Sequence, residues 1–215
     1  NCKIINTLKK KMKQFIIIVF TLIITGNITG QSSKCWPIYR GNNALTGVSN
    51  SNLQTPLRLL WTYKTEDAIK SSPVICDKNI YVASTDGCIY AIDYTGRFKW
   101  KFTTDVAFEA SPIIIKNTLI VGNLEGTVYA LDAKRGKLKW TYKTDGKVSG
   151  SCNWVSDGNK ITIIIPSYDF YLHAVDLQTG EVVWKCETDN YLNGAPASDN
   201  KNIVIGGFDG YMHMI

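Results

Sequence analysis

The stretch AIDYTGRFKW, residues 91–100, determines the fold of this chain, because it recurs twice in register. ALDAKRGKLKW follows at residues 130–140, and AVDLQTGEVVW follows at residues 174–184. Each copy has Ala-x-Asp, a short turn and then Gly-x-x-x-Trp. Trp61 continues the series on the N-terminal side, so that a tryptophan recurs about every 40 residues. This period indicates a repeat protein.

Each repeat has the sequence of four short strands. Val, Ile, Tyr and Thr are frequent, and stretches such as RFKWKF alternate apolar with polar residues, which is typical of strands. In the first repeat we expect strands at 70–76, 79–85, 88–93 and 97–103, with turns at Asp77-Lys78, Asp86-Gly87 and Thr95-Gly96. Units of this length with four strands are blades of a β-propeller. The sequence therefore predicts an all-β propeller of four-stranded antiparallel blades, about four of which are present.

The recurring residues have separate structural roles in the contact between neighbouring blades. We expect each Trp ring to be buried between blades, where its indole N–H needs a partner. The Ala allows close approach, and the Gly allows a tight turn before the outermost strand. The predicted blade-docking residues are Ala91, Asp93, Gly96, Trp100, Ala130, Asp132, Gly136, Trp140, Ala174, Asp176, Gly180 and Trp184.

The combination of Ala-x-Asp and Gly-x-x-x-Trp resembles the tryptophan-docking motif of the PQQ-like (pyrroloquinoline-quinone-type) propeller repeats. That family includes quinoprotein dehydrogenases and the propeller lipoprotein of the outer-membrane β-barrel assembly machinery. CWPIYRGNNALTGVS, residues 35–49, also resembles the start of many exported members. The resemblance covers residues 35–215 and implies a ring of seven or eight blades.

The fourth repeat stops before its Ala-x-Asp, which leaves two interpretations. In the favoured one, the chain is part of a longer protein with a larger ring. In the other, a strand around Leu59–Tyr63 completes the last blade and closes a four-bladed ring.

The N-terminal region has the pattern of a secretory leader. Lysines at 9–11 and 13 precede the apolar run FIIIVFTLIIT at residues 15–25, which is short for a membrane span. We therefore expect a signal peptide with an upstream extension at 1–30, a lead-in at 31–56 and PQQ-like repeats at 57–215. An uncleaved membrane anchor is the alternative for the first segment. A signal peptide implies export to the periplasm or the cell surface.

Charge and cysteine content restrict the classes of function. The formal net charge is +6, but five lysines lie within residues 1–30, so the remaining chain is nearly neutral and gives no reason to expect nucleic acid binding. The cysteines after the leader are Cys35, Cys76, Cys88, Cys152 and Cys186. Their odd number and wide spacing fit neither a disulfide framework nor a metal site. An exported protein could hold one disulfide, and the sequence leaves the pair open.

The residues that could take part in catalysis or metal binding stand at equivalent positions of the repeats. His173 and His213 occupy the position of Tyr90 and Tyr129, which indicates packing residues. Asp86, Glu125, Asp169 and Asp209 recur at matching turns, where carboxylates commonly bond the backbone. We therefore assign no catalytic, metal-binding or cofactor-binding residue. The resemblance implies that a quinone enzyme would need adjacent cysteines and a calcium site of Glu, Asn and Asp, and the chain has no adjacent cysteine pair.

Four aromatic residues depart from the repeat and are candidate binding residues: Trp36, Trp154, Tyr168 and Phe170. The alternative is that they only fill gaps in the packing. The favoured function is a non-enzymatic, exported scaffold for a protein or glycan partner in the cell envelope, touching a membrane only through a partner or an uncleaved leader. One alternative is part of a PQQ-dependent oxidoreductase, with PQQ and calcium held in further blades. The other is an outer-membrane protein assembly factor.

Overall fold

The computed structural model describes residues 35–49 and 51–215, so the expected leader lies outside the described residues. Among the described residues, no helix has the length and apolar character needed to cross a membrane. The strands are β1 (Val74–Cys76), β2 (Asn79–Ala83), β3 (Cys88–Asp93), β4 (Phe98–Thr103), β5 (Ile113–Ile115), β6 (Thr118–Gly122), β7 (Thr127–Asp132), β8 (Leu138–Lys143), β9 (Asn153–Ser156), β10 (Ile161–Pro166), β11 (Tyr171–Asp176), β12 (Val182–Glu187), β13 (Ala197–Ser198), β14 (Ile203–Gly206) and β15 (Met212–Met214).

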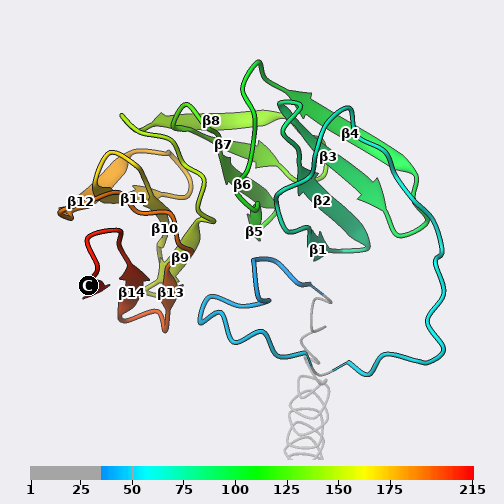
Figure 1. Ribbon diagram of the computed structural model, residues 1–215, viewed down its shortest axis with the longest axis horizontal. Helices are drawn as coiled ribbons and strands as arrows, with labels where there is room; N and C mark the ends of the chain where they lie inside the picture. Colours follow the sequence, from blue (N-terminus) through cyan, green and yellow to red (C-terminus); the bar gives the residue numbers. More distant parts are fainter. Residues whose placement is uncertain (1–34, 50) are drawn as a thin grey trace, which may run out of the picture. The chain divides into compact units, whose positions relative to one another are not determined.

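The strands form four antiparallel sheets in which each strand pairs with its neighbour along the chain. β1–β4, β5–β8 and β9–β12 are four-stranded, and β13–β15 is three-stranded. Figure 1 shows the sheets side by side along an arc, with β1, β5, β9 and β13 innermost. The predicted all-β propeller architecture with about four blades is confirmed.

Each complete blade has the same β-bulge in its fourth strand, where Lys99, Lys139 or Val183 has no partner in the third strand. The register between the third and fourth strands shifts directly after Ala91, Ala130 and Ala174. These alanines pair with Trp100, Trp140 and Trp184, respectively. A buried small residue opposite each large ring leaves room for the indole, and the bulge increases the local twist of the outermost strand.

The hydrophobic core lies between successive blades. Ile120 and Val128 of the second blade cluster with Ile163 and Val175 of the third, and all four side chains are fully buried. A second cluster joins the first and second blades, and a third joins the third and fourth. Since a blade buries its faces only against its neighbours, the stability of each unit depends on the adjacent units.

The lead-in segment 35–46 is a structural strap across all four blades. Trp36 forms a β-bridge with Ile75, and the carbonyl of Pro37 accepts a hydrogen bond from the N–H of Ile114 (2.8 Å). Further along, the carbonyl of Asn43 accepts hydrogen bonds from Asn153 Nδ2 and from the N–H of Ser198, both at 2.7 Å. Ile38 is fully buried in the core between the second and third blades.

A disulfide fixes the start of this strap to the innermost strand β1. Cys35 and Cys76 are bonded, with 4.2 Å between their Cα atoms. The sequence left this pairing open. The other cysteines of the described residues, Cys88, Cys152 and Cys186, are free thiols.

Residues Leu59–Tyr63, where the sequence offered a possible closing strand, form no strand and belong to none of the described sheets. β15 pairs only with β14 among the described residues, so the four-bladed closure is not observed. Trp61 nevertheless makes the same contact with the first blade that Trp100 makes with the second blade and Trp140 with the third.

Candidate interaction face

Three tryptophans join neighbouring blades through one repeated contact. The indole N–H groups of Trp61, Trp100 and Trp140 donate to the carbonyls of Tyr94, Ala133 and Leu177, at 2.9, 3.0 and 2.9 Å. Each acceptor directly follows the Asp of the Ala-x-Asp motif in the next repeat. The three rings are half-buried, and therefore less enclosed than the sequence led us to expect. Among the described residues Trp184 has no such acceptor.

The motif glycines lie under these rings. A Cβ atom built on Gly180 would be only 2.7 Å from the ring of Trp140, and Gly96 and Gly136 meet Trp61 and Trp100 in the same way. All three glycines have positive φ, between 67° and 82°. Only a residue without a side chain satisfies both the backbone conformation and the contact with the ring.

The motif aspartates organise the turn before the outermost strand. Asp93 accepts hydrogen bonds from the hydroxyl and N–H of Thr95 and pairs with Arg97. The Thr95 hydroxyl is the main cause that lowers the pKa of Asp93, with the backbone N–H groups adding to it. Asp132 and Asp176 accept N–H groups of their own turns at 2.9 and 2.7 Å. All three carboxylates therefore accept hydrogen bonds within their own turns.

The opposite ends of the strands form a second set of turns, which we call the upper face. It consists of the hairpin turns 84–87, 123–126, 167–170 and 207–210, and of the loops between blades at 65–72, 104–111, 144–151 and 188–195. A backbone hydrogen bond joins each loop to the hairpin turn that follows it in the chain. The N–H groups of Thr85, Leu124, Tyr168 and Phe208 donate, respectively, to the carbonyls of Ala68, Ala107, Lys147 and Tyr191. The same two positions are therefore held together in every blade.

A threonine that the sequence interpretation overlooked fixes these loops. It stands four residues after each repeat tryptophan, as Thr65, Thr104, Thr144 and Thr188. The Thr144 hydroxyl donates to the carbonyls of Gly126 (3.1 Å) and Gly146 (2.6 Å), and Thr188 makes the equivalent pair of contacts. Its constant offset from the tryptophan is the signal that could have revealed it.

His173 has the packing environment that its place in the repeat indicated. It is fully buried; Nε2 lies 3.0 Å from the Asp169 carboxylate, and Nδ1 lies 2.9 Å from the Tyr142 hydroxyl. Tyr90 occupies the same site in the first blade, where its hydroxyl donates to Asp86 at 2.7 Å. Imidazole and phenol thus make the same contact with the turn carboxylate.

The Tyr142–His173 pair gives a testable exchange. The second blade has Phe102 beside Tyr129 at the corresponding place. We expect His173→Tyr alone to cost about 1–3 kcal/mol, because a larger ring enters a filled site and the Tyr142 hydroxyl loses its partner. Adding Tyr142→Phe should recover most of this loss in urea unfolding. Additive losses in the double variant would contradict the packing role.

Asp169 should make stability depend on pH in acid. Burial is the largest single cause and tends to raise its pKa, but the hydrogen bond and charge of His173, together with hydrogen bonds from Ser167 and the Asp145 N–H, leave the pKa below its ordinary value of 3.8. A lowered folded-state pKa stabilises the fold above about pH 4, and this stability is lost as the pH falls through the folded value. We expect Asp169→Asn to reduce the slope of stability against pH below pH 4, by at most about 1.4 kcal/mol per pH unit. Equal slopes in chemical unfolding would contradict this expectation.

The upper face has a stack of side chains in the third and fourth blades, which we call the aromatic column. Lys147 Nζ lies 4.2 Å from the centre of the Tyr168 ring. Tyr168 stacks on Tyr191 with 4.4 Å between centroids, and Tyr191 stacks on Phe208 at 4.2 Å. The equivalent positions in the first two blades hold Ala68, Thr85, Ala107 and Leu124. The column is therefore a feature of one side of the propeller only.

The four candidate binding aromatics lie in different environments. Trp36 packs on Gly41, where an added Cβ would come within 2.8 Å of its ring, and Trp154 is half-buried against the core. Tyr168 belongs to the aromatic column, and Phe170 is exposed in the same turn. The sequence interpretation did not include Lys147, Tyr191 and Phe208, although their offsets from the repeat threonine and aspartate identify them.

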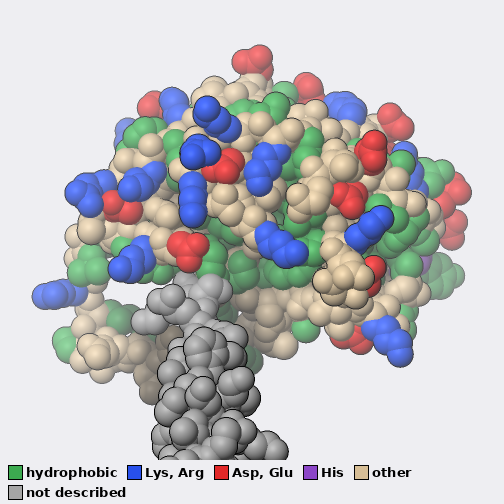
Figure 2. All heavy atoms as spheres, turned by 180° about the vertical axis from the view of Figure 1, so that it is seen from behind, with side chains coloured by type: hydrophobic (Ala, Val, Ile, Leu, Met, Phe, Trp, Pro, Cys, Tyr) green, Lys and Arg blue, Asp and Glu red, His purple; other side chains and the backbone are tan. Residues whose placement is uncertain are grey.

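The upper face is acidic, although the chain outside the leader is nearly neutral. Its turns and loops hold Glu66, Asp67, Asp86, Asp105, Glu109, Glu125, Asp145, Asp169, Asp189 and Asp209, against Lys70 and Lys147. Lys70 is paired with Glu109 at 2.6 Å. The turns at the other ends of the strands hold most of the basic residues of the blades. On the side of the molecule drawn in Figure 2, basic and acidic side chains are interspersed.

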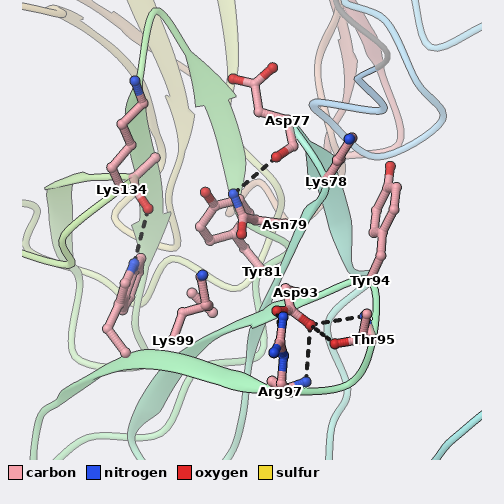
Figure 3. Close-up of a pocket in the computed structure, with 13 residues that line it drawn as sticks. Asp77, Lys78, Asn79, Tyr81, Asp93, Tyr94, Thr95, Arg97, Lys99 and Lys134 are labelled. Atoms are coloured by element: carbon pink, nitrogen blue, oxygen red, sulfur yellow. Dashed lines mark hydrogen bonds and ion pairs between the residues drawn. The ribbon is translucent and has the colours of Figure 1, made fainter.

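A pocket of about 520 Å³ lies between the first two blades, at the end of the strands opposite the upper face. Lys78, Lys99 and Lys134 line it, while Asp93 is engaged by its own turn (Figure 3). Burial, the largest cause, raises the pKa of Tyr81 in its wall to about 12, so that this hydroxyl stays protonated. A second pocket lies at the turns of the third blade, with Lys116 of the second blade in its wall.

The described cysteines do not provide a metal or quinone site. Cys35 and Cys76 lie close to Asp77, but they are joined to each other and are not thiolates. Burial raises the pKa of the Cys152 thiol to about 12, which keeps it neutral. The adjacent cysteine pair expected of a quinone enzyme has no counterpart in the described part of the chain.

Comparison with known proteins identifies the repeat. A family model described as "Outer membrane protein assembly factor BamB" matches residues 58–212. No curated protein sequence is significantly similar to the chain.

Solved structures share the fold at low sequence identity. BamB from Moraxella catarrhalis is 23% identical with a TM-score of 0.63, over 73% of this chain and 49% of that one. A europium-containing methanol dehydrogenase is 24% identical with a TM-score of 0.60, over 72% and 32%. The computationally designed Ika4 protein is 14% identical with a TM-score of 0.65, over 75% and 98%. The chain thus spans about half the length of the BamB structure and about a third of the dehydrogenase.

Proposed function

The chain belongs to the family described as outer membrane protein assembly factor BamB, and from this membership we propose that it is an exported, non-enzymatic scaffold that binds a protein partner of the outer-membrane assembly machinery. The aromatic column is the observation that carries the proposal. Exposed aromatic side chains held on a rigid framework are typical of binding surfaces, because they contribute large contact areas at low entropic cost.

The framework suits this role because the blades are joined by repeated contacts. Three indole hydrogen bonds and the strap join the blades, and the threonine hydroxyls fix the loops of the upper face. A pre-organised surface loses little conformational freedom when a partner binds. The scaffold needs no cofactor for this function.

A quinone oxidoreductase is the second candidate, and the likeness to the methanol dehydrogenase is the observation in its favour. That likeness concerns the fold, and a fold does not by itself imply an activity. Dye reduction with an alcohol substrate, after addition of PQQ and calcium, would distinguish the two functions. The scaffold proposal expects no activity above that of the free cofactor.

Co-purification tests the proposed function directly. We expect the tagged chain to retain identified outer-membrane assembly proteins from solubilised envelopes, and a Tyr191→Ala, Phe208→Ala double variant to lose them. Tyr94→Ala is the matched control, because Tyr94 is also an exposed aromatic but lies at the opposite ends of the strands. Retention of the same proteins by the double variant would contradict the placement of the site.

A further inference from the structure

We infer that the pocket between the first two blades binds a phosphate monoester, carried either by a soluble sugar phosphate or by a lipid headgroup. The whole wall of this pocket belongs to the first two blades and lies between residues 77 and 134. The site is separate from the proposed partner-binding surface, because it lies at the ends of the strands opposite the upper face.

Tyr81 departs from the repeat in the wall of this pocket. It pairs with Ala91 in the first blade, and the residues that pair with the equivalent alanines of the second and third blades are Ile120 and Ile164. Both isoleucines are fully buried, and Tyr81 is only 3% exposed. The first blade thus has a hydroxyl at a position where the other blades have an aliphatic side chain, so packing alone does not account for it.

The Tyr81 hydroxyl faces the pocket and has no acceptor among the described residues (Figure 3). The amide of Asn79 lies nearby, but its Nδ2 donates to the carbonyl of Asp77 at 3.2 Å. Burial, the largest cause, raises the pKa of Tyr81 to about 12, so the hydroxyl keeps its proton at neutral pH. It is therefore a donor that a ligand in the pocket can use.

The charge of the wall favours an anionic ligand. The lysines that line the pocket are Lys78, Lys99 and Lys134. Within residues 35–49 and 51–215, none of their ammonium groups makes a hydrogen bond or an ion pair. Asp93 is paired with Arg97, which leaves Asp77 as the one opposing charge of the wall. In the view of Figure 3, Lys99 extends toward Tyr81 in the middle of the pocket, with Lys78 and Lys134 on opposite sides.

The donors and the size of the pocket favour a phosphate monoester over a carboxylate. Ammonium groups and a protonated phenol require acceptor oxygens and negative charge from the ligand. A phosphate monoester has three acceptor oxygens and about −1.5 to −2 charges at neutral pH, which suits three lysines opposed by one aspartate. The volume of about 520 Å³ also leaves room for the sugar or glycerol that carries the phosphate.

Calorimetric titration of the purified chain with glucose 6-phosphate tests the inference, and glucose is the uncharged control. We expect glucose 6-phosphate to bind and glucose not to bind. Tyr81→Phe removes only the hydroxyl and Lys99→Gln removes one ammonium, so each should weaken binding at least about tenfold. Lys139→Gln is the matched control. Lys139 is the equivalent lysine of the second blade, but it lies outside the pocket and donates to Thr118 at 2.6 Å.

Vesicle sedimentation distinguishes the two sources of the phosphate. Phosphatidylcholine vesicles that contain phosphatidic acid present a monoester, and vesicles that contain phosphatidylglycerol present a diester. Sedimentation with phosphatidic acid that is lost in Tyr81→Phe would support the inference and identify a lipid headgroup. Binding of glucose 6-phosphate without such sedimentation would support it and identify a soluble ligand.

Two results would overturn the inference. One is no binding of either glucose 6-phosphate or phosphatidic acid, and the other is binding that Tyr81→Phe and Lys99→Gln leave unchanged or that Lys139→Gln weakens equally. We expect Tyr81→Phe to melt no lower than the wild-type chain, because the equivalent positions hold side chains without a hydroxyl. Co-purification of assembly proteins should be unchanged in Tyr81→Phe, so the failure of this site is distinguishable from the failure of the proposed function.

Discussion

Replacement of Trp140 by Ala should destabilise the propeller by about 3 kcal/mol, which is the lower end of the range for buried aromatic side chains. The ring is half-buried, stacks on Gly180 and donates to the carbonyl of Leu177. Its removal leaves a gap between the second and third blades and an unpaired carbonyl. For a folded region of this size we expect the melting temperature to fall by about 6–12 °C.

Trp140→Phe is the matched control for this measurement. It keeps most of the ring contact with Gly180 and removes the indole N–H, so we expect a loss of only about 1 kcal/mol. A melting temperature that does not change in Trp140→Ala would show that the contact between blades does not contribute to stability.

Loss of the Cys35–Cys76 disulfide should have the other large effect. The bond closes a loop with a sequence separation of 41 residues. Removing it increases the entropy of the unfolded chain, which corresponds to about 4 kcal/mol for a loop of this length. The same bond holds the strap, whose Ile38 is buried between two blades.

Chemical unfolding of Cys76→Ser, with and without a reducing agent, measures this effect. The wild-type chain should lose stability on reduction, and Cys76→Ser should be insensitive to it. Cys186→Ser is the control, because Cys186 is a free thiol. An equal unfolding midpoint for oxidised and reduced wild-type chain would contradict the expected contribution.

The blade architecture could be predicted from the sequence because it depends on local patterns that recur. The alternation of apolar residues places the strands, and the constant offset of Trp100 and Trp140 from Gly-x-x-x places the contacts between blades. The strap could not be predicted in this way. Asn43 contacts Asn153 and Ser198, more than a hundred residues away, and no repeat relates it to them.

The candidate site was predicted only in part, for a related reason. Tyr168 was identified because it departs from the repeat in its own turn. Tyr191 and Phe208 stand at fixed offsets from the repeat threonine and aspartate, but they come together only because the loop at 188–191 crosses the turn at 207–210. Trp36 and Trp154 depart from the repeat as well, but packing on Gly41 and on the core accounts for them.

Site-specific photo-crosslinking tests the central claim, that the aromatic column is the surface at which the scaffold binds its partner. A photoreactive phenylalanine analogue would replace Phe208 in one variant and Phe98, an exposed residue of β4, in the other. We expect crosslinking in cells to one identified envelope protein from position 208 and none to that protein from position 98. Equal crosslinking from both positions, or crosslinking from position 98 alone, would contradict the account.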